Sequence, residues 1–226
     1  MLDSTIRPWI DPPLDFIGKR MAAYNVSANT ITLIGFSIGL IAIVMISLKQ
    51  YNIAVIFILL NRLLDGIDGA IARNGYQSDF GGFLDVLCDF IIYAGIIFAF
   101  GFANPDKLMY VAFLIFSFIG PITSFLGYAI IAAKKQINTV CRGQKSFYYL
   151  GGICEGTETA FMLVLICIYP HYFNIISLIF GILCWLTTIG RVYNTWTDFG
   201  KSDATSSETV ASVYKEPAKA TESQAL

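Results

Sequence analysis

Four aspartates lie within apolar stretches of the chain, in the segment LLDGIDGAIARNGYQSDFGGFLDVLCDF. They form two pairs, Asp65 with Asp68 and Asp85 with Asp89, and the spacings of three and four residues put each pair on one helical face. An aspartate at the centre of a bilayer costs about 2.5–3.5 kcal/mol on insertion scales. Four such residues are therefore expected to have a function and to have cations or water beside them.

The two pairs are expected to face each other across one cavity. The helix that carries the first pair runs down to a turn near residues 74–78, where Asp79 is exposed to water, and the next helix climbs back. At about 1.5 Å per residue, Asp68 and Asp85 lie roughly 9–11 Å from that turn, and the other two roughly 13–17 Å from it. Converging carboxylates suit Mg²⁺ or Mn²⁺, and two such ions can bind a phosphoryl group between its attacking and leaving oxygens.

Small residues and one arginine accompany the aspartates. Glycines let a bulky diphosphate approach the backbone and let helices pack closely. Arg73, at the rim of the membrane, could neutralise phosphate oxygens, although an arginine there is also an ordinary flank of a membrane helix. The glycines in question are Gly66, Gly69, Gly81 and Gly82.

The elements that must position these residues are membrane helices. The 226 residues are 56% hydrophobic and only 14% charged, where soluble domains have about 25% charged residues. Six apolar segments are long enough to span a bilayer. The sequence therefore predicts an all-α membrane protein with six transmembrane helices, at about 28–48, 52–73, 79–103, 108–133, 150–169 and 173–197. A GxxxG motif at Gly35 and Gly39 is expected to pack the first segment closely against a neighbour.

The flanks of this bundle have a different composition. Residues 1–24 form an N-terminal interfacial segment, in which DFIGKRMAAY, residues 15–24, could lie as a helix in the membrane interface. Residues 200–226 are polar and are expected to be disordered. The transmembrane domain would then be residues 25–199. The formal net charge of −1 gives no reason to expect a nucleic-acid partner.

Basic residues near the segment ends predict the orientation. Lysine and arginine gather in the N-terminal segment, after the second segment, after the fourth and after the sixth. The positive-inside rule then places both termini and the aspartates' turn in the cytoplasm. We expect a multi-pass protein of a bacterial cytoplasmic membrane, with its active site open to the cytoplasm.

The order and spacing of these residues resemble the signature of the CDP-alcohol phosphatidyltransferases. The matching pattern is Asp65-xx-Asp68-Gly69-xx-Ala72-Arg73, followed by Gly81-xxx-Asp85-xxx-Asp89. One departure is that seven residues separate Arg73 from Gly81, where the family usually has eight. The shorter turn leaves both helical halves of the motif intact, and the resemblance extends over about residues 1–199.

The resemblance implies transfer of a phosphatidyl group from CDP-diacylglycerol to a small alcohol, with release of CMP. It implies that the first three aspartates bind metal, and that Asp89 completes the metal site and is the general base. The family commonly forms dimers, so a homodimer is possible. The CDP moiety would lie against Gly69, Ala72, Arg73 and Gly81, together with Asn29 and Thr32 of the first helix. For Asn29 and Thr32, a place at the start of that helix is an equal alternative.

A second polar patch is a candidate acceptor site. Glu155 and Glu158 are three residues apart at the start of the fifth segment, and they could hydrogen-bond an acceptor or pair with Arg191 or nearby lysines to hold the bundle together. Arg191 is itself a candidate acceptor-binding residue. A group of basic residues follows the fourth segment. It could bind a phosphorylated acceptor, as in family members that use inositol phosphate or glycerol phosphate, or it could simply follow from the positive-inside rule. It comprises Lys134, Lys135, Arg142 and Lys145. The acceptor stays open among glycerol 3-phosphate, inositol or its phosphate, and serine.

Two other functions are alternatives to this transferase reaction. Buried aspartates also occur in ion and proton pathways, so a metal-gated transporter is an alternative. The same motif serves transfer of a CDP-linked head group onto diacylglycerol. His171 is the only histidine and lies at a predicted membrane border, which argues against histidine chemistry.

Overall fold

The computed structural model describes residues 2–75, 77–135 and 152–200, and every regular element in these ranges is helical. Three short elements, η1 (Pro105–Lys107), η3 (Pro170–Tyr172) and the π-helical η4 (Trp196–Gly200), flank the longer helices. The longer helices are α1 (Leu2–Ala23), α2 (Ala28–Ser47), α3 (Tyr51–Asn74), α4 (Asp79–Ala103), α5 (Leu108–Lys134), α6 (Gly156–Ile168) and α7 (Phe173–Thr195).

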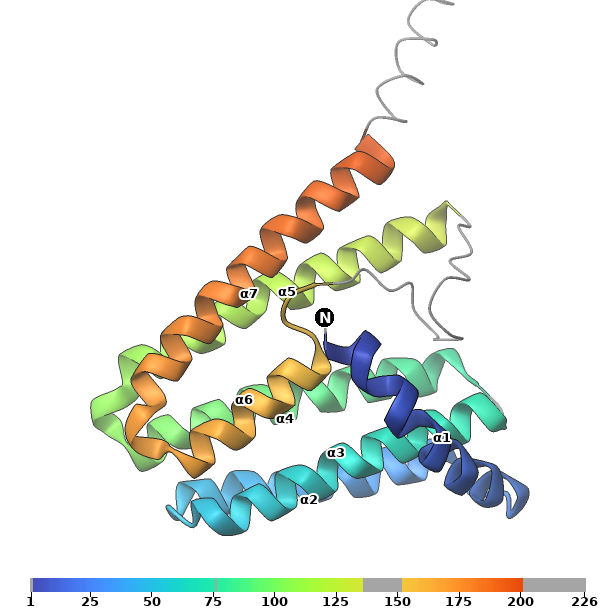
Figure 1. Ribbon diagram of the computed structural model, residues 1–226, viewed down its shortest axis with the longest axis horizontal. Helices are drawn as coiled ribbons and strands as arrows, with labels where there is room; N and C mark the ends of the chain where they lie inside the picture. Colours follow the sequence, from blue (N-terminus) through green and yellow to red (C-terminus); the bar gives the residue numbers. More distant parts are fainter. Residues whose placement is uncertain (1, 76, 136–151, 201–226) are drawn as a thin grey trace, which may run out of the picture.

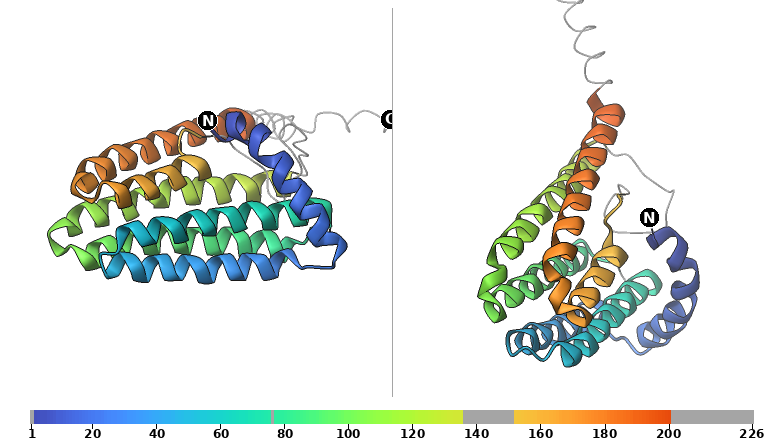
Figure 2. Two further views of the ribbon diagram at one scale, coloured as in Figure 1. Left: turned by 60° about the horizontal axis from the view of Figure 1, so that its bottom comes forward. Right: turned by 60° about the vertical axis from the view of Figure 1, so that its left-hand side comes forward.

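The long helices form two groups that meet at one end and separate at the other. Helices α2, α3 and α4 run side by side as one group, and α5 pairs with α7 as the other (Figures 1 and 2). Helix α6 lies between the groups against α3, and α1 crosses the separated end, where it contacts α3 and α6. The separated end, which we call the open end, carries the turn between α3 and α4.

Aromatic packing joins the two groups at the opposite, closed end. The ring of Phe100 in α4 lies between Tyr51 of α3 and Phe173 of α7, with centroid distances of 5.2 Å and 4.9 Å. Asn104 donates a hydrogen bond to the Tyr51 hydroxyl at 2.9 Å. Because Phe100 and Phe173 are fully buried, this end is a tightly packed core, and the helices are free to diverge only at the open end.

The glycines of α2 allow close packing, as expected from the GxxxG motif. A Cβ at Gly35 would lie 3.3 Å from the Cβ of Leu64 in α3, and one at Gly39 would lie 2.6 Å from Cδ1 of Ile92 in α4. A side chain at Gly39 would therefore push α2 away from α4. The packing interpretation of this motif is confirmed.

The outer faces of the helices are apolar. Four elements of the described chain are long and apolar enough to cross a membrane: α2, α4, η1 with α5, and η3 with α7 and η4. Helix α3 has 24 residues but carries the charged residues of the motif, and α6 has only 13. Large exposed side chains such as Ile56, Phe98 and Ile179 cover the outside, as expected for a multi-pass membrane protein.

Two predicted boundaries are wrong. The fifth apolar segment was expected to be helical from residue 150, but α6 begins at Gly156, because the Glu155 side chain caps its first turn and Glu158 bonds back to the Glu155 backbone. The N-terminal helix begins at Leu2, ahead of the stretch expected to be helical, even though it contains three prolines. The polar tail after Gly200 lies outside the described residues.

Candidate active site

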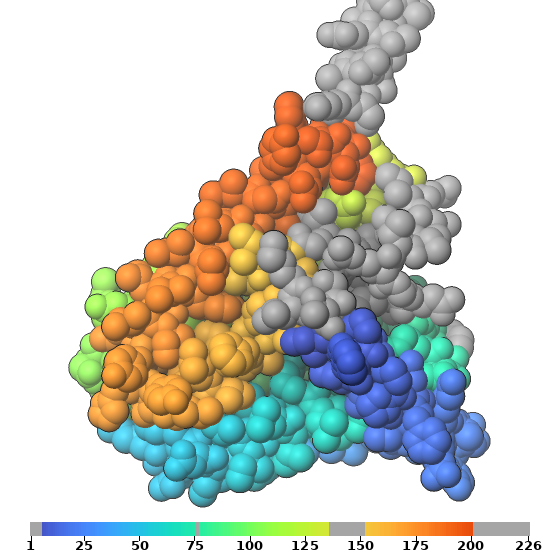
Figure 3. Space-filling view, in the orientation of Figure 1, coloured from blue at the N-terminus to red at the C-terminus, as the bar shows by residue number. Residues whose placement is uncertain are grey.

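A cavity of about 530 Å³ opens between the diverging helices at the open end. All four motif aspartates line it, together with residues of α1, α2, α5 and α7. In the space-filling view, α1 lies along the side of this end, next to α3 (Figure 3). One cavity thus brings together the two polar patches that the sequence singled out.

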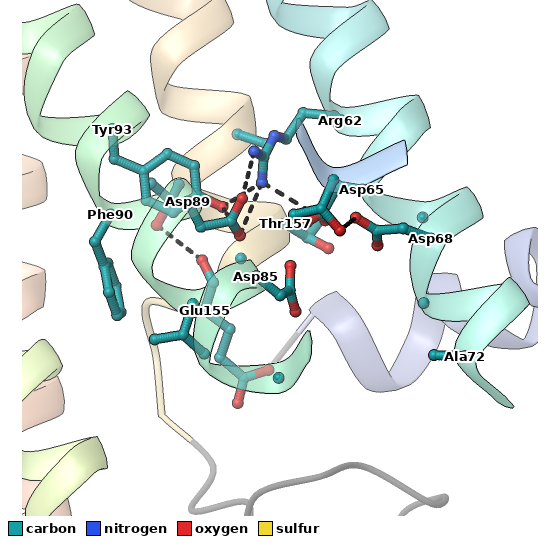
Figure 4. Close-up of a pocket in the computed structure, with 18 of the residues that line it drawn as sticks. Arg62, Asp65, Asp68, Ala72, Asp85, Asp89, Phe90, Tyr93, Glu155 and Thr157 are labelled. Atoms are coloured by element: carbon teal, nitrogen blue, oxygen red, sulfur yellow. Dashed lines mark hydrogen bonds and ion pairs between the residues drawn. The ribbon is translucent and has the colours of Figure 1, made fainter. Parts of the chain in front are cut away.

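Three of the aspartates form a cluster. Asp65 and Asp68 of α3 and Asp85 of α4 each place a carboxylate oxygen within 4.8 Å of the others. Figure 4 shows the three side chains directed toward one another across the gap between the two helices. Asp68 is buried, and the Thr32 hydroxyl of α2 donates a hydrogen bond to its Oδ2 at 2.6 Å. The two helices thus bring three of the four expected carboxylates together.

Asp89 stands beside this cluster with different partners. Its Oδ1 accepts a hydrogen bond from Arg62 Nη2 at 2.6 Å, and its Oδ2 accepts one from Arg62 Nη1 at 3.2 Å. The Tyr93 hydroxyl also donates to Oδ2, at 3.1 Å. Figure 4 shows the arginine above the four aspartates, with its guanidinium directed at Asp89. A bidentate ion pair with Arg62 therefore fixes Asp89 in the cavity wall.

Asn61 forms hydrogen bonds to Arg62 and so fixes the position of its guanidinium. The Oδ1 of Asn61 accepts hydrogen bonds from Arg62 Nε at 3.0 Å and from Arg62 Nη2 at 2.7 Å. Asn61 in turn donates to the backbone oxygen of Gly35 at 2.9 Å. A chain of hydrogen bonds thus runs from the backbone of α2 through α3 to the carboxylate of Asp89 on α4.

The residues expected to bind CDP line the rim of the cavity. Gly69, Ala72, Arg73, Gly81, Asn29 and Thr32 all belong to its wall. At Gly81 a Cβ would lie 2.8 Å from Asn29 Oδ1, so a larger residue would disturb this wall. Thr32 has a role that the sequence did not suggest, because its hydroxyl holds Asp68. Of the two helix starts that the sequence offers, Ser27 and Asn29, the structure has Ser27 as the N-cap of α2, without a side-chain capping bond.

Helix α1 contributes two acids to this rim. Asp15 Oδ1 lies 2.9 Å from Arg73 Nη2, and Asp11 Oδ1 lies 4.0 Å from it. The helix can approach because α3 has small residues beneath it: a Cβ at Gly66 would lie 2.7 Å from Leu14 Cδ1. The spacing of four residues between Asp11 and Asp15 puts both acids on one face of a helix, but it does not identify Arg73 as their partner.

The candidate acceptor residues divide into three groups. Glu155 and Arg191 line the cavity, and both are buried; Arg191 Nη1 donates to the Pro121 backbone oxygen at 2.8 Å. Glu158 caps α6, and its Oε2 accepts the Glu155 backbone N–H at 3.1 Å. Lys134 and Lys135 are exposed at the end of α5, while Arg142 and Lys145 lie outside the described residues.

The three-carboxylate cluster is chemically suited to a divalent cation. Its ligand atoms are hard oxygens from two helices, and Mg²⁺ and Mn²⁺ prefer such donors. Carboxylates so close together in a membrane protein repel one another unless a cation is shared between them. The residues present therefore fit a metal centre, and the large adjoining cavity leaves room for a phosphorylated substrate.

Comparisons with known proteins give a consistent result. The profile of the family described as CDP-alcohol phosphatidyltransferase matches residues 25–193. The chain is 45% identical to the inner membrane protein YnjF of Escherichia coli, over 86% of this chain and 95% of that protein. It is 33% identical to the archaetidylinositol phosphate synthase of Pyrococcus horikoshii, over 84% of this chain and 94% of that one.

A solved structure shares the fold. The crystal structure of Mycobacterium tuberculosis phosphatidylinositol phosphate synthase, with CDP-DAG bound, superimposes with a TM-score of 0.61 and covers 81% of this chain and 94% of that one. Its sequence identity to this chain is 16%, so the similarity concerns the arrangement of the helices.

Proposed function

The chain belongs to the CDP-alcohol phosphatidyltransferase family, and we propose that it transfers the phosphatidyl group of CDP-diacylglycerol to a hydroxyl of a phosphorylated polyol, releasing CMP. The observation that carries this proposal is the meeting of Asp65, Asp68 and Asp85 within 4.8 Å beside Asp89, in a cavity of about 530 Å³. The product would be a phospholipid, so the enzyme acts in phospholipid biosynthesis.

The metal centre would be formed by the motif aspartates. Asp65, Asp68 and Asp85 would hold one Mg²⁺ or Mn²⁺, and a second ion would also use Asp89. When bound, these ions would neutralise the donor diphosphate and the charge that develops on the leaving CMP. The family generally uses divalent metals, and the oxygen donors of the cluster support the same assignment here.

Asp89 would be the general base. One of its carboxylate oxygens would take the proton of the acceptor hydroxyl, and the resulting alkoxide oxygen would attack the lipid-side phosphorus. The bond from that phosphorus to the CMP oxygen would break, and CMP would leave with the bonding electrons. Support comes from the position of Asp89 in the cavity wall and from its orientation by Arg62 and Tyr93.

The donor and the acceptor would approach from different sides. Asn29, Thr32, Gly69, Ala72, Arg73 and Gly81 line the wall near the turn between α3 and α4 and would hold the CDP moiety. The acceptor would lie toward α6 and α7, where Arg191 would contact its phosphate and Glu155 its hydroxyls. The charges of Lys134, Lys135, Arg142 and Lys145 would attract the anionic acceptor. Glu158 would support Glu155 through the cap of α6.

A phosphorylated acceptor is favoured by the buried arginine and by the relatives. A guanidinium inside a cavity suits an anionic ligand better than inositol or serine, which carry no phosphate. One relative is an archaetidylinositol phosphate synthase, and the solved structure that shares the fold is a phosphatidylinositol phosphate synthase. Inositol phosphate is therefore our first candidate, and glycerol 3-phosphate is the second.

The arrangement in the membrane completes the proposal. Helices α3 and α6 would join the four apolar spans to make six, with residues 25–199 as the membrane domain and residues 200–226 as a cytoplasmic tail. The N-terminal helix, within residues 1–24, would lie in the interface, because Trp9 and Phe16 are exposed on it. The open end would face the cytoplasm of a bacterium, and the subunits would pair as homodimers.

The test is CMP release by the purified protein from CDP-diacylglycerol. We expect turnover with Mn²⁺ or Mg²⁺ that is abolished by EDTA, and the fastest rate in an acceptor panel with inositol phosphate. The panel also contains glycerol 3-phosphate, inositol and serine, and a parallel arm offers a CDP-linked head group with diacylglycerol. Absence of metal-dependent CMP release with every acceptor would contradict the proposal.

A further inference from the structure

Arg62 is an arginine in the middle of an apolar helix, and neither the motif nor the comparisons assign it a role. Its side chain is 15% exposed and lies one turn farther from the open end than Asp65. A charged side chain at membrane depth is unfavourable unless it pairs with another group, and it commonly marks a functional site. The partners of Arg62 therefore indicate what it does.

The guanidinium of Arg62 forms a bidentate ion pair with the carboxylate of Asp89, and we call this contact the fork. Nη2 and Nη1 contact Oδ1 and Oδ2 at 2.6 Å and 3.2 Å, while Nε and Nη2 contact Asn61 Oδ1 on the other side. Nη1 also lies 2.5 Å from the Tyr93 hydroxyl. A planar guanidinium held at both edges fixes the direction of the carboxylate, which the single ammonium of a lysine cannot do.

These contacts set Asp89 apart from the other three aspartates. Asp65, Asp68 and Asp85 lie within 4.8 Å of one another, whereas both oxygens of Asp89 are engaged by Arg62. Arg62 Nη1 also lies 3.7 Å from Asp65 Oδ2, so the guanidinium is next to both the cluster and the fourth aspartate. A fixed positive charge there repels a cation that approaches Asp89.

We propose that Arg62 positions Asp89 and, as a fixed cation, weakens the binding of a second divalent ion at this carboxylate until the donor is present. The inference rests on the proposed function. The Asp65, Asp68 and Asp85 cluster is then the tight site in the free enzyme. The donor diphosphate brings the negative charge that favours a second ion beside Asp89, so donor and second ion bind together.

The experiment is a Mn²⁺ titration of the purified protein without donor, followed by electron paramagnetic resonance. In the wild type we expect one tight equivalent and a weaker second one, which tightens when CDP-diacylglycerol is added. Arg62→Gln removes the charge, so the second equivalent should tighten by at least about tenfold while the first is unchanged. Arg62→Lys keeps the charge without the fork, so its binding curve should match the wild type.

Turnover separates the two parts of the proposal. Both variants lose the bidentate contact, and we expect kcat to fall at least about tenfold in each, with the KM for CDP-diacylglycerol nearly unchanged at saturating Mn²⁺. A second equivalent that is equally weak in Arg62→Gln and in the wild type overturns the inference. So does an Arg62→Lys variant with wild-type kcat.

The lysine variant decides the outcome if the glutamine variant does not purify as a single species. A wild-type binding curve with lowered kcat in Arg62→Lys then supports the proposal, and any other combination overturns it. Failure here is distinct from failure of the proposed function, which is measured by metal-dependent CMP release from the wild-type enzyme.

Discussion

Asp15 on α1 lies 2.9 Å from the guanidinium of Arg73 at the end of α3, and the two residues are 58 positions apart in the chain. Their contact joins the N-terminal helix to the rim where the CDP moiety is proposed to bind. The Asp15 side chain is 37% exposed and that of Arg73 is 28% exposed, so water weakens the pair without removing its directional effect. The helix thus restricts where the arginine can point.

We expect Asp15→Asn to raise the KM for CDP-diacylglycerol and to leave kcat nearly unchanged. Partly exposed ion pairs contribute about 0.2–1 kcal/mol, which corresponds to a rise in KM of up to about fivefold. The measurement is a donor titration in mixed micelles. The control is Asp106→Asn, which removes an exposed acid at the closed end. An equal change in both variants would contradict a specific role for Asp15.

Thr32→Val should weaken metal binding. The Thr32 hydroxyl donates to Asp68 at 2.6 Å, and valine keeps the shape of the side chain while it removes the donor. Changes to residues that orient metal ligands typically cost about tenfold to a hundredfold in metal affinity or activity. The Mn²⁺ concentration for half-maximal turnover measures the effect.

Thr123→Val is the matched control for that measurement, because the Thr123 hydroxyl bonds only to backbone oxygens of its own helix among its described contacts. We expect it to keep the wild-type dependence on Mn²⁺. If Thr32→Val kept that dependence too, the hydrogen bond to Asp68 would not matter for metal binding.

The aspartate cluster could be predicted from the sequence because it depends on local geometry. Spacings of three and four residues fix which side chains share a helical face, and a short turn brings the two helices together at matching depth. The structure confirms the predicted range of α4, from residue 79 to residue 103, and places Asp65, Asp68 and Asp85 together. The apolar segments likewise follow from composition alone.

The remaining parts of the site depend on contacts between distant residues. The pairing of Arg62 with Asp89 requires a particular side-chain direction across two helices, and that of Asp15 with Arg73 requires α1 to pack over α3. Neither is encoded in a spacing. The predicted start of α6 is wrong for another reason: Glu155 and Glu158 form a capping box, and this cap begins the helix at Gly156, six residues after the predicted start at residue 150.

Asp89→Asn should abolish turnover and leave the tight Mn²⁺ equivalent in place. The amide cannot accept the acceptor's proton, and general-base catalysis typically contributes about 10²–10⁴-fold. The first equivalent should persist, because the cluster of Asp65, Asp68 and Asp85 does not include residue 89. CMP release is measured beside Mn²⁺ binding on the same preparation, with Asp79→Asn as the control. A fully active Asp89→Asn enzyme would show that another group is the base.

Arg191→Gln should change acceptor use and spare the donor. The Arg191 side chain is buried in the wall of the cavity on the side of α7, away from the rim proposed for CDP. A hydrogen bond to a charged group contributes about 1.5–3 kcal/mol, so the KM for a phosphorylated acceptor should rise at least about tenfold. The KM for CDP-diacylglycerol should stay within about twofold, because residues on α2, α3 and α4 would hold the donor.

The stability of this variant needs its own control, since Arg191 Nη1 also bonds to the Pro121 backbone oxygen at 2.8 Å. Arg191→Lys keeps a positive charge at the site and should recover part of the acceptor affinity if a phosphate is bound there. Equal losses with inositol phosphate and with unphosphorylated inositol would argue against phosphate recognition by Arg191. A matching rise in the KM for the donor would instead mean that the substitution disturbs the whole cavity.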